Sequence, residues 1–132
     1  MPATHPLASR RRVPMSHLAD AEWAACQPGT GHYDMHIRAC RRLGGFEPDL
    51  RYASDDFLIQ LELVRTTGAC ALLPDLVLSY GAPGVAVRAI AEGTIVREAF
   101  LLTRASRTPA VEALAAALTA AAQGERVSGQ SR

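Results

Sequence analysis

The chain of 132 residues has few aromatic side chains, no long apolar run and almost no net charge. Its formal net charge of +1 provides no overall field that would attract nucleic acid or an anionic membrane. No apolar run approaches the ~20 residues that span a bilayer. The opening MPATHPLASRRR has the wrong order of charged and apolar residues for a secretion signal. We therefore expect a cytoplasmic protein that makes no contact with a membrane.

Signatures of catalysis and of metal binding are also missing. The cysteines Cys26, Cys40 and Cys70 form no close-spaced pair and stand among apolar residues, as free cytosolic cysteines do. The motifs GxSxG, HExxH and CxxC do not occur. His32, His36 and Cys40 share a helix face, but the first and last would lie roughly 12 Å apart along the axis, too far for one metal ion. We expect no enzyme activity, no cofactor and no metal site.

Short apolar runs that alternate with amphipathic segments indicate a fold of alternating strands and helices. We predict strands over Trp23–Cys26, Leu50–Ala53, Ala69–Leu73, Val85–Ile90 and Val96–Thr103. We predict helices over Ser16–Asp20 (capped by Ser16), His32–Leu43, Asp56–Thr66 (capped by Asp55), Asp75–Tyr80 and Pro109–Ala122. Such an alternation requires parallel crossovers, so the fold class is α/β with an open, mostly parallel sheet and flanking helices.

Ligands of open parallel sheets bind outside the carboxyl ends of the strands. Six polar side chains lie in the loops that follow the predicted strands Trp23–Cys26 and Leu50–Ala53. They are Gln27, Thr30, His32, Tyr33, Ser54 and Asp55. The first of these loops also leads into a helix N-terminus, where free amides favour an anion. The same loop would equally serve as an ordinary strand-to-helix connection.

Five segments resemble the regulatory domain of LysR-type transcriptional regulators. They are His5-Pro6-Leu7-Ala8, Leu18-Ala19-Asp20 before Trp23, GGFEP at 44–48, LVRTTGACALLP at 63–74, and VREAFLLTRASRTPAVEALAAAL at 96–118. Their order and spacing make the resemblance specific. One departure is Thr67-Gly68-Ala69, where the glycine is displaced by one position from the family pattern. The resemblance implies a type II periplasmic-binding-protein-like fold with a small organic effector, often a carboxylate, in the cleft between two α/β subdomains.

The resemblance also implies that the chain is truncated, because nothing in it corresponds to the family's winged helix-turn-helix or to the first part of its regulatory domain. We expect an extended hinge segment over 1–17, a nearly whole second subdomain over 18–90, a remnant of the first subdomain over 91–122 and a disordered tail over 123–132. The chain alone should not bind DNA. It should form homo-oligomers, because the strand and helix of the remnant would otherwise lack cover.

The expected function is that of an effector-binding sensor domain of such a regulator. Two other functions remain open. One is a truncated interaction or dimerisation protein that binds no ligand, and the other is an extracytoplasmic solute-binding protein of the same general fold. The missing export signal argues against the solute-binding protein.

Overall fold

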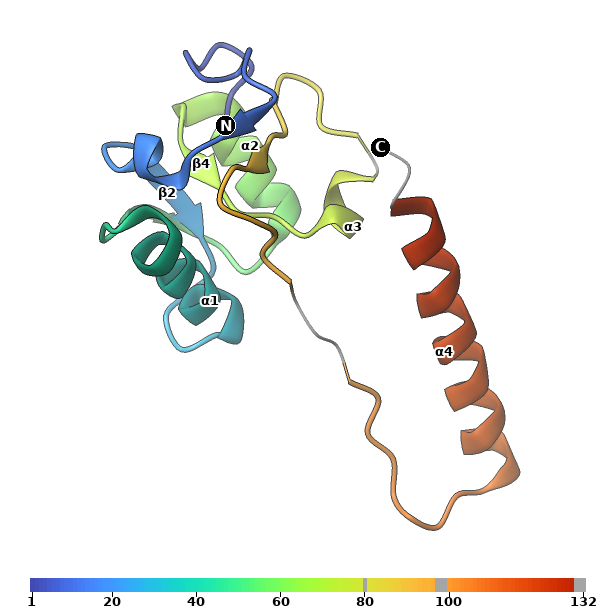
Figure 1. Cartoon of the computed structure of the whole chain (residues 1–132). Coiled ribbons are helices and arrows are strands. Elements are labelled where there is room, and N and C mark those ends of the chain that lie inside the picture. The colour runs from blue at the N-terminus through green and yellow to red at the C-terminus, as the bar shows by residue number, and fades with distance from the viewer. Residues whose placement is uncertain (80, 97–99, 130–132) are drawn as a thin grey trace. The chain divides into compact units, whose positions relative to one another are not determined.

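The computed structural model describes residues 1–79, 81–96 and 100–129, and only the backbone of 124–129. The chain forms two compact units, Met1–Ile95 and Val96–Arg132. The first unit contains every strand of the described residues, and the second contains a long helix and the segment that leads into it (Figure 1). The strands of both sheets pair in parallel and are separated by helices, which confirms the predicted α/β class.

A three-stranded parallel sheet in the order β3–β2–β4 is the centre of the first unit. Its strands are β2 (Glu22–Ala25), β3 (Asp49–Ala53) and β4 (Cys70–Ala71). The consecutive residues Trp23, Ala24 and Ala25 are all buried, so β2 is covered on both faces. β4 is shorter than the predicted Ala69–Leu73, because the carbonyl of Leu72 accepts a hydrogen bond from a histidine side chain and not from a strand.

Two helices cover the faces of this sheet, α1 (Gly31–Ala39) and α2 (Phe57–Thr67). The ring of Trp23 lies against His36 of α1. Cys26 lies three residues further along the chain and so on the opposite face, where its Sγ accepts a hydrogen bond from Gln60 of α2. The sheet is therefore sandwiched between the two helices that connect its strands.

Two glycines end the first of these helices. α1 continues into a π-helical turn, η2 (Cys40–Gly44), which the apolar periodicity did not predict. Gly45 then takes a left-handed conformation with a φ of 72°. A Cβ on Gly44 would collide with the ring of Phe46 and would lie 2.9 Å from the Cγ of Met15. Gly44 is thus required by close packing, and Gly45 by backbone conformation.

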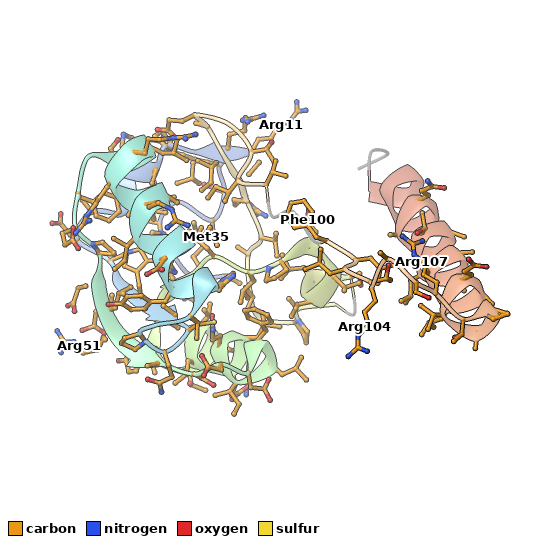
Figure 2. The ribbon with its side chains drawn as sticks, turned by 90° about the horizontal axis from the view of Figure 1, so that it is seen from below. Arg11, Met35, Arg51, Phe100, Arg104 and Arg107 are labelled. Carbon is orange, nitrogen blue, oxygen red and sulfur yellow. The ribbon has the colours of Figure 1, made fainter. Side chains whose placement is uncertain are left out.

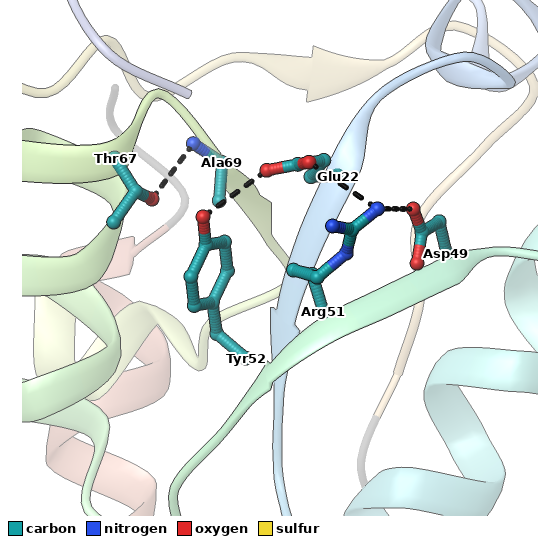
Figure 3. A network of polar contacts seen from close by, with 6 residues as sticks. All are labelled: Glu22, Asp49, Arg51, Tyr52, Thr67 and Ala69. Carbon is teal, nitrogen blue, oxygen red and sulfur yellow. Dashed lines mark hydrogen bonds and ion pairs between the residues drawn. The ribbon is translucent and has the colours of Figure 1, made fainter.

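The displaced glycine of the second helix still occupies a turn position. Gly68 follows the last residue of α2 and has a φ of 87°, the left-handed value that favours glycine. The next amide, that of Ala69, donates to the Thr67 Oγ1 at 3.3 Å (Figure 3). The departure from the family pattern therefore leaves an ordinary helix C-terminus that leads directly into β4.

A second, two-stranded parallel sheet pairs β1 (Arg12–Val13) with β5 (Ala89–Ile90). The predicted strand Val85–Ile90 is therefore wrong in extent, because β1 offers only two residues to pair with. The remaining short elements are the 3₁₀ helix η1 (Met15–Leu18) and α3 (Asp75–Leu78). Tyr80, the last residue of the predicted Asp75–Tyr80 helix, lies outside the described residues.

The N-terminus of η1 is satisfied by a distant side chain and not by the predicted Ser16. Pro14 occupies the N-cap position and makes no side-chain cap bond. The amide of Met15 instead donates to both carboxylate oxygens of Glu92, each at 3.1 Å. The prediction that Ser16 caps this helix is wrong, because Ser16 lies inside it.

The core of the first unit gathers around Trp23. Its ring stacks on Phe46 with ring centroids 6.4 Å apart, and it meets His36 edge-on at 4.9 Å. Met15 and Cys40 are completely buried beside it. Burial raises the pKa of the Cys40 thiol to about 12, and the nearby charge of Glu47 acts in the same direction. This thiol therefore stays neutral and serves as an apolar core side chain.

The second unit consists of α4 (Pro109–Gly129) and the segment before it. Thr108 caps α4 by accepting from the amide of Val111 at 3.4 Å. α4 continues past Gln123, where a tail was predicted, and residues 130–132 of that tail lie outside the described residues.

The strand predicted over Val96–Thr103 is not formed in its described part, because no described strand pairs with it. Its residues 97–99 lie outside the described residues. The side chains of Phe100, Arg104 and Arg107 project from this segment (Figure 2).

Candidate functional site

Three loops meet at the carboxyl ends of β2, β3 and β4, and hydrogen bonds join them. The amide of Gln27 donates to the Asp55 Oδ1 at 2.8 Å, which ties the loop after β2 to the loop after β3. The amide of Ser54 also donates to the carbonyl of Ala25 at 2.9 Å. The Nε2 of His32 lies 3.0 Å from the carbonyl oxygen of Leu72 and so ties the first loop to the loop after β4. We call these three joined loops the carboxyl edge.

Thr30 organises the start of α1 at this edge. Its Oγ1 donates to the carbonyl of Gln27 at 2.9 Å and accepts from the amide of Tyr33 at 3.2 Å, so Thr30 is the helix N-cap. Among the described residues, the amides of Gly31 and His32 make no hydrogen bond. The N-terminus of α1 therefore keeps two free donors, as a binding site for an anion requires.

Asp55 does not cap α2, as the sequence led us to expect. Asp56 does so, with its Oδ1 accepting from the amides of Leu58 at 2.8 Å and Ile59 at 3.4 Å. The hydroxyl of Ser54 accepts from the amide of Asp56 at 3.2 Å, and this turn moves the helix start one residue further on. The carboxylate of Asp55 is thereby left to hold the neighbouring loop through Gln27.

The imidazole of His32 is held from two sides. Its Nε2 bonds to Leu72 after β4, and its ring meets the ring of Phe57, the first residue of α2, with centroids 5.0 Å apart and planes at 66°. These contacts come from two different elements, so the ring has little freedom to turn. Of the six predicted site residues, Gln27 and Tyr33 contribute only backbone groups to the hydrogen bonds at this edge.

Gln60 stabilises the carboxyl edge from the interior of the first unit, and it was not predicted as a site residue. It is completely buried, and its Nε2 donates to the carbonyl of Ser54 at 2.6 Å and to the Cys26 Sγ at 3.4 Å. Its Oε1 is buried without a hydrogen-bond partner. A polar residue on the apolar stripe of Phe57, Leu61 and Val64 was the available signal, because a glutamine in such a stripe usually bonds to buried backbone.

His36 lies one turn beyond His32 but belongs to the core. Burial, and to a lesser extent the proximity of His32, lower the pKa of His36 to about 4. Neither ring nitrogen of His36 has a hydrogen-bond partner, and its ring lies against Trp23. The two histidines therefore point to different surroundings. Within the described ranges no group of three His, Cys, Asp or Glu side chains could hold a metal ion.

The amino ends of the strands carry a separate network of charges (Figure 3). The guanidinium of Arg51 lies 3.5 Å from Glu22 and 3.0 Å from Asp49, and the hydroxyl of Tyr52 donates to Glu22 at 3.1 Å. These charged side chains are about half exposed, so water screens their attraction and the network contributes little to stability. Both acids are already paired within the network, which leaves the carboxyl edge as the candidate site.

Two open hollows lie away from the carboxyl edge. One, of about 430 Å³, is lined by His5, Ser9, Arg88 and their neighbours in the first unit. The other, of about 670 Å³, lies within the second unit beside α4. Neither is lined by a predicted site residue. In the described part of the chain, none of the helices combines the length and the hydrophobicity that spanning a bilayer requires.

Residues 1–123 match the family model of the LysR substrate binding domain, which covers nearly the whole chain. None of the curated proteins with which the chain was compared matches it significantly. The family match confirms the resemblance that the five segments indicated. It also confirms the predicted periplasmic-binding-protein-like fold class.

Proposed function

The chain belongs to the LysR substrate-binding domain family, and from this premise we propose that it is the effector-binding sensor domain of a LysR-type transcriptional regulator. Domains of this family bind small-molecule effectors and belong to regulators of transcription, not to enzymes. We accordingly assign the chain to the cytoplasm and give it no catalytic role. The family match over residues 1–123 is the observation that carries the proposal.

We place the effector at the carboxyl edge and propose that it is a small carboxylate. The two free amides at the start of α1 support this assignment, since they favour negatively charged oxygens. The ligand would meet Gln27, Thr30, His32 and Tyr33 on one side and Ser54 and Asp55 on the other. Asp55 already accepts from the amide of Gln27, so its role would be to hold the loops in position.

Calorimetry against a panel of small carboxylates tests this proposal. A carboxylate that binds should lose about tenfold in affinity in His32→Ala, because one hydrogen-bonding side chain is removed from the site. Thr30→Ala should weaken binding and also destabilise α1 by about 1 kcal/mol, whereas Thr30→Ser keeps the cap.

The matched control is His17→Ala, which removes an exposed histidine from η1. Its affinity for the same carboxylate should equal that of the unchanged chain. A ligand whose affinity is the same in Thr30→Ala and His32→Ala would place the site elsewhere.

Homo-oligomerisation is the second part of this proposal. LysR regulators oligomerise, and the second unit exposes large apolar side chains that a partner could cover. Phe100 is 78% exposed and Leu102 is 89% exposed, and Val111, Leu114 and Leu118 form an exposed stripe on α4. Their spacing of three and four residues places the last three on one face of the helix.

Light scattering over a dilution series should show a dimer or higher oligomer at micromolar concentration. Replacing Leu114 and Leu118 with glutamine should shift the equilibrium toward monomer by about tenfold or more, because two large apolar contacts are lost. The control replaces Leu58 and Leu76 with glutamine, since both are exposed in the first unit. A compact monomer of the unchanged chain at this concentration would contradict the proposal.

A further inference from the structure

His32 is held as a single tautomer. Its Nε2 lies 3.0 Å from the carbonyl oxygen of Leu72. A carbonyl oxygen can only accept, so the hydrogen of this bond belongs to Nε2. A neutral imidazole has one N–H group, so Nδ1 is left as a hydrogen-bond acceptor. Among the described residues, Nδ1 makes no hydrogen bond.

The His32 ring cannot easily flip so that Nδ1 takes the place of Nε2. Turning it over would break the bond to Leu72 and disturb the edge contact with Phe57. The titratable groups on the surrounding elements include His36 and Asp34 on α1, Asp55 and Asp56 before α2, and Asp75 at the start of α3. Of these, His36 is neutral in the core, and Asp55 and Asp56 accept from backbone amides.

The same residue therefore offers a donor and an acceptor side by side. The backbone amide of His32, with that of Gly31, is free to donate to carboxylate oxygens. The Nδ1 of His32, in the same residue, needs a donor. A plain carboxylate satisfies the amides but leaves a methylene group against Nδ1, and a binding site loses affinity when a polar group is left unpaired.

Building on the proposed function, we infer that His32 makes the carboxyl edge selective for carboxylates that carry a hydroxyl or amino group next to the carboxyl group. The hydroxyl or amino hydrogen donates to Nδ1 while the carboxylate oxygens accept from the amides of Gly31 and His32. The donor must lie within a few bonds of the carboxyl group, because both protein groups belong to one residue.

Matched pairs of acids test this selectivity in the full chain. Calorimetry at about pH 8, where histidine side chains are neutral, compares lactate with propionate and malate with succinate. We expect each hydroxy acid to bind about tenfold more tightly than its plain partner, the effect of one well-placed hydrogen bond. In His32→Ala the ratio should fall to about one, whereas His17→Ala should preserve it.

The possible results separate this inference from the proposed function. Equal affinity within each pair, or a preference that persists in His32→Ala, would overturn the inference and leave the carboxylate site standing. If neither acid of either pair binds, the carboxylate site and the inference are both wrong.

The tautomer itself is measurable without any ligand. A long-range ¹H–¹⁵N correlation spectrum distinguishes the two neutral forms of histidine, and the signals missing in His32→Ala identify this ring. We expect the Nε2–H form at about pH 8. An Nδ1–H form, or an even mixture of the two, would remove the geometric basis of the selectivity and overturn the inference.

Discussion

Replacing Trp23 with alanine should lower the free energy of unfolding of the first unit by about 3–5 kcal/mol. Trp23 is only 1% exposed and stands on the central strand, where its ring contacts both His36 and Phe46. Its removal leaves a cavity that surrounding helices cannot fill without moving. Since domains of this size are typically stable by about 5–15 kcal/mol, much of the total would be lost. Urea unfolding followed by circular dichroism measures the change.

Two variants serve as controls for this experiment. Trp23→Phe keeps an aromatic ring and removes an indole N–H that has no hydrogen-bond partner, so its cost should be smaller than that of Trp23→Ala. Val87→Ala, at a half-exposed position, should change stability by no more than about 0.5 kcal/mol. A loss below about 1 kcal/mol in Trp23→Ala would show that this core is not organised around the indole ring.

Acid should destabilise the first unit through His36. The folded protein holds the pKa of His36 at about 4 because the ring is buried without a hydrogen-bond partner, whereas an exposed histidine has a pKa near 6.5. Between these two values the unfolded chain binds a proton that the folded chain does not. Stability is therefore fully present above about pH 6.5 and falls as the pH is lowered toward about 4, by about 3 kcal/mol in all.

Unfolding curves at a series of pH values measure this loss, and His36→Phe isolates it from other groups. Hydrogen bonds from Arg41 and Arg65 lower the pKa values of Glu47 and Glu62, and burial and the N-terminal charge lower the pKa of His5. These groups remain in His36→Phe, so the difference between the two pH profiles belongs to His36. We expect the difference to vanish above about pH 7. Identical profiles below that pH would mean that His36 is protonated equally in both states.

Patterns that lie within one element were sufficient to locate the main elements of the first unit. The apolar run at Trp23 predicted β2, and the amphipathic pattern over Asp56–Thr66 predicted α2. Both patterns record which side chains are apolar and have to be buried, and such a pattern can be recognised within a few neighbouring residues. The carboxyl edge followed from the same reasoning, because parallel strands bring the loops after them to one side of the sheet.

The predictions from the sequence were wrong where the interaction partner of a residue lies far away along the chain. Glu92 caps a helix that begins 77 residues earlier, at Met15, and no local pattern connects the two. The helical spacing of His36 and His32 gave no sign of different surroundings, yet its position against Trp23 makes His36 a neutral core residue. The strand predicted from Val96 onward has an apolar composition, but a strand also needs a neighbour to pair with.

The sequence by itself determined the α/β class, the family and the set of polar residues at the carboxyl ends of the strands, since each depends on the order of apolar and polar residues along the chain. Only the tertiary structure decided what those polar residues do. Asp55 and Asp56 are adjacent and chemically identical, but one holds a neighbouring loop and the other caps a helix. The tautomer of His32 likewise depends on the carbonyl of Leu72, which lies 40 residues away. Hydrogen bonds are directional and short, so such roles are set by where the fold brings each partner.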